Sequence, residues 1–291
     1  MILLIGGSGY VGKTFQTFLS ERNIPYSNVS RSEVDYYDKA QLAQLIKETK
    51  TTFLINAAGY TGKPNVDACE DHKTDTLLGN AILPGVIREV CEDLKLTWGH
   101  VSSGCIYTGR RSDGNGFTET DPPNFSFRTN NCSFYSGTKA LGEEVLEGAE
   151  NCYIWRLRIP FNHIDSPRNY LSKLLTYEYL LEAENSISHL DDFVAACIAT
   201  WKNKIPSGIY NITNPGSVTT KQVVELLQQH LTPERSFKFF ENEDEFMQKA
   251  ARTPRSNCVL DSSKIIQAGI TLRPAEEAII HSLNNWSANQ N

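Results

Sequence analysis

Short apolar runs alternate with longer amphipathic stretches through the first half of the chain. The apolar runs are predicted to form strands over residues 1–5, 26–29, 52–56, 96–102 and 152–156. The stretches with helical periodicity are predicted to form helices over 10–21, 40–49, 74–94 and 134–147. Because strands that alternate with helices build βαβ units, we expect a parallel sheet covered by helices on both faces.

The alternation weakens after about residue 160. Loops rich in Asn, Pro and Ser separate helices predicted over 170–182, 191–202 and 220–230. We therefore expect an α/β protein with a Rossmann-type, doubly wound parallel sheet over residues 1–160. Residues 161–291 should form mainly a smaller C-terminal substrate-binding lobe, with some strands and helices returning to the first domain. Such a lobe would cover the carboxyl edge of the sheet, where ligands bind in these folds.

Composition narrows the functional classes. A net charge of -6 gives no indication of a basic surface that would bind nucleic acid. No apolar run approaches the ~20 residues that span a bilayer, and the chain starts directly on an apolar strand, so we expect a cytoplasmic protein without a membrane anchor. The 7 cysteines follow neither a disulfide framework nor a metal-binding spacing. They are interpreted as reduced thiols, and no metal site is expected.

A glycine-rich segment follows the first predicted strand and opens the first helix. Glycines at positions 6, 9 and 12 permit a tight turn, close approach of a pyrophosphate and close packing of helix on sheet. The helix N-terminus adds free N–H groups and a partial positive charge. The segment predicts a dinucleotide site rather than a purely structural turn. Its expected cofactor contacts are Gly6, Ser8, Gly9, Tyr10, Val11 and Gly12.

The end of the second strand decides between the two nicotinamide cofactors. A carboxylate there binds the ribose hydroxyls of NADH, whereas an arginine accommodates the extra phosphate of NADPH. This chain has Ser30 and Arg31 at that place, so NADPH is favoured, although a solvated surface arginine and use of NADH stay open. A run of small residues after the third strand would let the backbone approach the adenosine and ribose; it comprises Asn56, Ala57, Ala58 and Gly59.

A serine, a tyrosine and a lysine form the candidate catalytic group. Tyr135 and Lys139 are four residues apart and so share one helix face, and Ser103 follows the fourth strand. Lys139 and the oxidised nicotinamide would lower the pKa of the Tyr135 phenol enough for proton transfer near neutral pH. Ser103 would hold the substrate carbonyl. Tyr135 and Lys139 are also expected to contact the cofactor, and Lys139 would anchor the nicotinamide ribose. The alternative is an ordinary Tyr and Lys on an amphipathic helix.

This combination resembles the extended short-chain dehydrogenases. Further segments resemble the nucleotide-rhamnose synthases, which are bifunctional 3,5-epimerase/4-reductases related to dTDP-4-dehydrorhamnose reductase. They span most of the chain in order: 55–67 with Cys69-Glu70, 103–106, 133–136, 166–170, 208–211 and 254–257. The resemblance implies that Ser103, Tyr135 and Lys139 carry the reduction. It also implies roles for Cys105 and Lys173 in epimerisation, although either residue could instead be structural or solvated.

Residues for the substrate nucleotide are less specific. Arg168 with Asn169, and Arg255 with Asn257, offer guanidinium and amide donors for a diphosphate. Loop arginines that pair with local carboxylates are the alternative. The segment His189–Asp192 resembles one that organises the second lobe in extended members, and it is interpreted as structural.

The sequence therefore predicts an enzyme that epimerises carbons 3 and 5 of a UDP- or dTDP-linked 4-keto-6-deoxy sugar and then reduces carbon 4. The order follows from the ketone, which acidifies the hydrogens at both neighbouring carbons. A separate 4,6-dehydratase should supply the keto sugar, and a homodimer is possible from the superfamily. The alternatives are a reductase that accepts only epimerised sugar, or a non-catalytic cofactor-binding regulatory subunit.

Overall fold

The computed structural model describes residues 1–287. Its centre is a sheet of six parallel strands in the order β10-β5-β4-β3-β1-β2. These strands are β1 (Ile2–Ile5), β2 (Tyr26–Val29), β3 (Phe53–Asn56), β4 (Trp98–Ser103), β5 (Cys152–Leu157) and β10 (Gly208–Asn211). The strand order reverses at β1, which lies between β2 and β3, and the carboxyl ends of strands at such a switch point bind ligands. The predicted doubly wound parallel sheet is confirmed.

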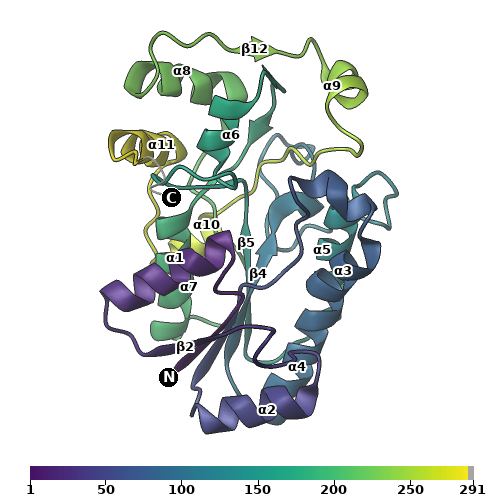
Figure 1. The fold of residues 1–291 in the computed structure, drawn as a ribbon, viewed down its shortest axis with the longest axis vertical. Helices are drawn as coiled ribbons and strands as arrows, with labels where there is room; N and C mark the ends of the chain where they lie inside the picture. Colours follow the sequence, from purple (N-terminus) through teal and green to yellow (C-terminus); the bar gives the residue numbers. More distant parts are fainter. Residues whose placement is uncertain (288–291) are drawn as a thin grey trace.

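Helices cover both faces of the sheet because the side chains of each buried strand point alternately to the two sides. In β1, Ile2 and Leu4 pack on one side, and Leu3 and Ile5 on the other. The first side carries α1 (Tyr10–Glu21) and α7 (Leu190–Lys202). The second carries α2 (Lys39–Glu48), α4 (Leu83–Asp93) and α5 (Phe134–Val145). Figure 1 shows these two layers on either side of the strands.

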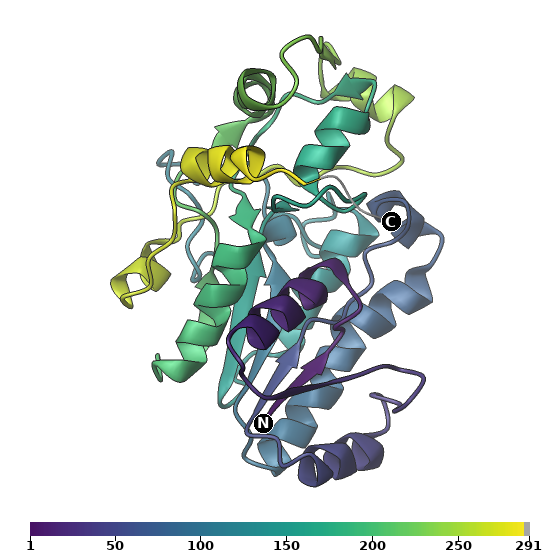
Figure 2. The ribbon, with the colours of Figure 1, turned by 60° about the vertical axis from the view of Figure 1, so that its left-hand side comes forward.

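A smaller lobe lies over one end of the sheet, as Figures 1 and 2 show. Its own apolar core is built from α6 (Tyr170–Thr176), α8 (Thr220–His230) and α11 (Ala275–Asn284), with α9 (Glu243–Lys249) at its outer edge. Three short strand pairs complete it: β6 (Pro160–Phe161) with β9 (Ser188–His189), β7 (Tyr179–Leu180) with β12 (Lys238–Phe239), and β8 (Glu184–Asn185) with β11 (Val218–Thr219).

Parts of the second half of the chain return to the sheet. The helix α7 packs against α1, β10 forms an edge strand, and α10 (Ser263–Gln267) packs against β10. The segment His189–Asp192 lies where the lobe meets α7. Its Asp192 accepts hydrogen bonds from Arg273, the shortest at 2.6 Å, and from Asn214 at 3.0 Å. A domain boundary near residue 160 stays a prediction. No helix within residues 1–287 has the length and apolarity to cross a membrane.

Two predicted helices differ from the observed ones. The stretch 74–94 consists of α3 (Lys73–Leu77), a π-helical turn (Leu78–Ile82) and α4. The side chain of Asn80, inside that wide turn, accepts a hydrogen bond from Tyr60 N at 2.9 Å and donates one to Tyr60 O at 2.9 Å. The loop after β3 is therefore fixed to the widened helix. The helix predicted over 170–182 ends at Thr176, because the chain then extends into β7.

Candidate active site

In the glycine-rich loop, backbone atoms approach Gly6 and Gly12 too closely for any side chain to fit there. Gly6 has a φ of +84°, and a Cβ there would lie 2.4 Å from Ala58 N. A Cβ on Gly12 would lie 2.1 Å from the carbonyl oxygen of Gly6. Gly9 caps α1 without a side chain, which leaves the first N–H groups of the helix free for an anion. The loop therefore fits a dinucleotide pyrophosphate.

The run of small residues after β3 packs directly against this loop. Asn56 is buried, its Oδ1 accepts a hydrogen bond from Ala58 N at 3.1 Å, and its Nδ2 lies 3.0 Å from His100 Nδ1. Ala57 N donates to Ile5 O at 2.9 Å. The side chain of Asn56 therefore shapes the turn, while Ala57, Ala58 and Gly59 leave the backbone open at the switch point.

Tyr10 connects the cofactor loop to the second lobe. Its phenol donates to Asn162 Oδ1 at 3.0 Å, in the segment that follows β5. Burial raises the pKa of Tyr10, and the neighbouring Asp191 carboxylate raises it further, so the phenol stays protonated. The first turn of α1 is thus fixed to the lobe that would cover a bound ligand.

Ser30 and Arg31 lie exposed after β2. The Ser30 hydroxyl and N–H both donate to Glu33, at 2.6 and 2.7 Å, and these hydrogen bonds lower the pKa of that carboxyl. Arg31 makes no ion pair within residues 1–287, so its guanidinium is free to meet a ligand phosphate. Glu33 therefore caps the turn, and Arg31 is the cation at the expected position.

The predicted catalytic group is assembled at the carboxyl end of β4. Ser103 ends β4, and its hydroxyl accepts a hydrogen bond from Cys105 N at 3.2 Å. The ring of Tyr135, in the first turn of α5, packs against the apolar cluster that contains Cys105, and the Ser103 hydroxyl is close enough to lower the pKa of its phenol. Lys139, one turn further along α5, donates from Nζ to Val101 O at 3.2 Å. Ser103, Cys105, Tyr135 and Lys139 therefore lie in one buried group.

Burial dominates the electrostatics of the tyrosine and lysine. It raises the pKa of Tyr135, and the nearby thiols of Cys105 and Cys69 add to this effect, while Ser103 and the charge of Arg158 oppose it. Burial lowers the pKa of Lys139. The lowered Tyr135 pKa that the sequence predicts depends on bound oxidised nicotinamide as well as on Lys139, so it stays a prediction. In the chain alone, desolvation outweighs the groups that lower the pKa. A phenol held protonated in this way is suited to donating a proton to a substrate oxygen.

Cys105 lies in the short turn Gly104–Ile106 directly after Ser103. Burial raises the pKa of the thiol, and this is partly offset by the Ser103 hydroxyl and by the charges of Arg158 and Lys139. The side chain therefore belongs to the same group as Ser103 and Tyr135. In the chain alone it is favoured as a thiol and not as a thiolate.

Lys173 lies in α6 of the smaller lobe, among other cations. Burial lowers the pKa of its amine, and the guanidinium groups of Arg168 and Arg255 lower it further. Arg168 donates to Gly62 O at 2.6 Å, in the loop after β3. A lysine depressed by burial and like charges loses its proton more readily, so Lys173 has the character of a general base.

Three residues predicted to bind the substrate have partners within the protein. Asn169 is fully buried, where it caps α6 and donates to Asn162 O and Ile164 O, both at 2.8 Å, so its side chain holds the loop instead. Arg255 pairs bidentately with Asp67 at 2.7 and 2.8 Å. The amide oxygen of Asn257 accepts a hydrogen bond from Asn185 at 3.1 Å. Of the two predicted arginines, Arg168 is the one without a carboxylate partner within residues 1–287.

A buried ion pair behind the catalytic group escaped sequence reasoning. Arg156 in β5 binds Glu143 of α5 bidentately, with distances from 2.6 to 3.1 Å, and Glu143 also accepts from Ser102 at 2.5 Å. Glu143 is one turn beyond Lys139, so this pair fixes α5 against β4 and β5. The only hint in the sequence was the charged Glu143, four positions after Lys139 on the same helix face. Helix periodicity does not show that the partner of Glu143 is Arg156 in β5.

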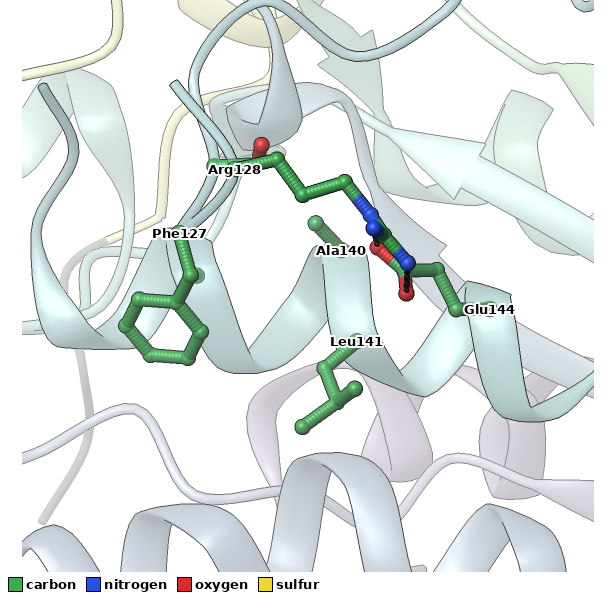
Figure 3. Close-up of a pocket in the computed structure, with 7 residues that line it drawn as sticks. Phe127, Arg128, Ala140, Leu141 and Glu144 are labelled. Carbon is green, nitrogen blue, oxygen red and sulfur yellow. Dashed lines mark hydrogen bonds and ion pairs between the residues drawn. The ribbon is translucent and has the colours of Figure 1, made fainter. Parts of the chain in front are cut away.

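A depression of about 230 Å³ lies on the outer face of α5, away from the catalytic group. Figure 3 shows Phe127 and Leu141 on one side and the Arg128–Glu144 ion pair on the other. The ring of Phe127 lies where a Cβ on Gly137 would be, yet 44% of the side chain is exposed. The two faces of α5 therefore differ: one carries Tyr135 and Lys139, and the other carries an apolar surface.

The fold and the buried Ser, Tyr and Lys group define a Rossmann-type protein of the short-chain dehydrogenase class. A model of the RmlD substrate-binding domain matches residues 1–287. The chain belongs to this family, whose relatives are reductases of the dTDP-4-dehydrorhamnose reductase type.

Two Arabidopsis thaliana proteins are each 32% identical over 283 residues, which is 96% of this chain. One is a bifunctional dTDP-4-dehydrorhamnose 3,5-epimerase/reductase, of which the match covers 90%. The other is a trifunctional UDP-glucose 4,6-dehydratase/UDP-4-keto-6-deoxy-D-glucose 3,5-epimerase/UDP-4-keto-L-rhamnose-reductase, and the chain spans 41% of its length.

Solved structures share the fold. The L780 UDP-rhamnose synthase of Acanthamoeba polyphaga mimivirus matches with a TM-score of 0.89 at 23% identity, over 98% of this chain and 99% of that one. A dTDP-4-dehydrorhamnose reductase from Bacillus anthracis, in complex with NADP, matches with a TM-score of 0.80 at 17% identity, over 96% of each chain.

Proposed function

We propose that this protein is a bifunctional 3,5-epimerase/4-reductase that converts UDP-4-keto-6-deoxy-D-glucose to UDP-L-rhamnose with NADPH. The observation that carries the proposal is the convergence of Ser103, Cys105 and Tyr135 in one buried group beside Lys139. A reductase needs the serine, tyrosine and lysine. A thiol in the same group supplies a further proton donor, which epimerisation requires.

The epimerisation needs a base on one face of the sugar and a proton donor on the other. Lys173, whose pKa is lowered, is the proposed base that removes the hydrogen next to the ketone and leaves an enolate. Cys105, whose pKa is raised, is the proposed donor that protonates the opposite face. Each transfer leaves an ammonium and a thiolate, and exchange with water returns them to amine and thiol.

The reduction follows at carbon 4. Bound NADPH supplies the hydride. Its pyrophosphate would lie on the loop after β1, where Gly6 and Gly12 permit a tight turn that has no room for a side chain. Ser103 would hold the ketone oxygen and Tyr135 would donate the proton to it. Lys139 would bind the nicotinamide ribose. Reduction must come last, because it removes the ketone on which both epimerisations depend.

The test is proton NMR of the product formed from UDP-4-keto-6-deoxyglucose and NADPH in heavy water. The proposal expects a rhamno-configured sugar with deuterium at carbons 3 and 5 and stoichiometric loss of NADPH. Loss of NADPH without deuterium at those carbons would leave a plain 4-reductase. No turnover would favour a cofactor-binding regulatory subunit. A parallel reaction with the dTDP sugar would show which nucleotide is preferred.

Arg31 provides a test of the cofactor preference. Replacing Arg31 by Ala should raise the KM for NADPH about tenfold and leave that for NADH unchanged, because only NADPH carries the phosphate that a guanidinium binds. Steady-state kinetics with both cofactors measure this. Arg22→Ala is a matched control, since Arg22 is an exposed arginine at the other end of α1. An equal change for both cofactors would remove Arg31 from the phosphate site.

The remaining expectations concern partners. A 4,6-dehydratase is the class of enzyme whose reaction makes the ketone that this site would use. A homodimer stays a prediction. A candidate for its interface is the apolar surface formed by Phe127, which precedes α5, and Leu141 of α5. Sedimentation analysis of the purified protein would measure its oligomeric state.

A further inference from the structure

Arg158 is a buried cation without a counterion. Its side chain is only 7% exposed, yet it forms no ion pair within residues 1–287. The atom Nη2 donates to Asn185 Oδ1 at 2.6 Å and to the carbonyl oxygen of Ser256, and both acceptors are neutral. The buried Nε donates to nothing within the described part of the chain. Burying a guanidinium in this way costs several kcal/mol unless a negative charge compensates it.

A neighbour on the same strand shows that the fold can provide such compensation. Arg156, two residues earlier, is 2% exposed and is neutralised by the bidentate contact with Glu143. No carboxylate within residues 1–287 plays this part for Arg158. The charge of Arg158 is therefore left for an anion that the resting protein does not contain.

Hydrogen bonds place this guanidinium beside the turn that carries Cys105. Asn185 Oδ1, which accepts from Arg158, also accepts from Cys258 N at 3.0 Å, and Cys258 Sγ donates to Gly104 O at 3.2 Å. Ser256, the other acceptor, donates from its hydroxyl to Tyr107 O at 2.6 Å. The two acceptors of Arg158 are thus linked to residues on either side of Cys105.

Two cations act electrostatically on the thiol of Cys105. Those cations are Arg158, which follows β5, and Lys139 of α5, and both lower the pKa of the thiol. Hydroxyl groups of Ser103 and Ser136 act in the same direction. The other titratable groups that act electrostatically with Cys105 are Tyr135, Cys69, Cys132 and Cys258.

We propose that Arg158 is the countercharge for the thiolate that forms when Cys105 gives its proton to the sugar. It is a positioning residue, because it acts through Cys105 and not on the reacting carbon. This inference rests on the proposed epimerase function and names the residue whose fixed charge would stabilise the thiolate. Lys139 would be engaged by the cofactor ribose, so Arg158 is the cation left for the thiolate.

Two variants remove the free charge in different ways. Arg158→Gln deletes the guanidinium. Asn185→Asp keeps the residue's size and adds a carboxylate 2.6 Å from Arg158 Nη2, which supplies the missing counterion without opening a cavity. Arg158→Lys keeps the charge and is the conservative control. Because Asn185→Asp leaves Arg158 in place, it remains informative if the first variant folds poorly.

The first readout is the titration midpoint of the Cys105 thiol. It is measured from thiolate ultraviolet absorbance, as the difference between each protein and its Cys105→Ala counterpart. The midpoint should rise by about one pH unit in Arg158→Gln and Asn185→Asp, because a close cation is lost or neutralised in a buried site. It should stay near the wild-type value in Arg158→Lys. This readout requires no turnover, so it tests the inference even if the epimerase proposal fails.

The second readout compares the two reactions. In Arg158→Gln and Asn185→Asp, deuterium exchange at carbons 3 and 5 should slow at least about threefold relative to reduction of epimerised sugar, since proton transfer depends on the acidity of the donor. Arg158→Lys should restore the ratio. An unchanged Cys105 midpoint in both variants would overturn the inference. So would an equal loss of exchange and reduction, which would place the charge at the substrate or at Tyr135.

Discussion

Replacing Tyr135 by Phe should lower the kcat for reduction of the epimerised keto sugar by about a thousandfold, within the range expected when a general acid is removed. The side chain of Tyr135 is partly buried and the pKa of its phenol is raised, so it holds a proton at neutral pH and can deliver it to the developing alkoxide. The phenylalanine ring fills the same space, and NADPH affinity should stay within about twofold. Stopped-flow consumption of NADPH and fluorescence titration of the cofactor measure the two quantities.

Tyr153→Phe is the matched control for this prediction. It also removes a buried phenol, but that phenol donates to Ile205 O at 2.7 Å, away from the catalytic group. Reduction should persist in this variant. Deuterium exchange at carbons 3 and 5 should continue in Tyr135→Phe, because Lys173 and Cys105 are the groups proposed for it. A Tyr135→Phe protein that still reduces the sugar at a near-normal rate would remove the tyrosine from the mechanism.

Replacing Cys105 by Ala should slow deuterium exchange at carbons 3 and 5 by about a hundredfold or more, while reduction of already epimerised sugar changes little. The thiol is the only proposed proton donor for one face of the sugar, and alanine offers none. Lys173→Met should give the same division of activities by removing the base. Proton NMR in heavy water measures exchange, and NADPH absorbance measures reduction of the epimerised substrate.

Cys132→Ala is the control, since Cys132 is a partly exposed thiol just before α5 that has no assigned part in the reaction. Both activities should persist in it. If exchange and reduction survive in both Cys105→Ala and Lys173→Met, the epimerase assignment fails and the protein is a reductase. If both activities disappear together with the folded state, thermal unfolding will show that the replacement was structural.

Patterns over a few neighbouring residues predicted the strands of the main sheet and the turn into the first helix. Apolar runs bounded by turns gave five strands of the main sheet to within two residues at each end, and the glycine spacing placed the turn into α1. The helix that carries Tyr135 and Lys139 was predicted from its periodicity, and the four-residue spacing then placed both side chains on one face. Contacts across the chain were not predictable in this way. The π-helical turn around Asn80 depends on Tyr60, 20 residues earlier in the sequence.

The sequence by itself determined the doubly wound sheet, the glycine loop after β1 and the residue types of the catalytic group, because these follow from periodicity and from spacing over a few residues. Only the tertiary structure decided the electrostatics of the site. Burial sets the pKa directions of Tyr135, Lys139 and Cys105. The structure also shows that Arg255 has the Asp67 carboxylate as its partner, while Arg158 has no carboxylate partner among the described residues. Desolvation and pairing depend on distances between residues far apart in the chain, which no local pattern records.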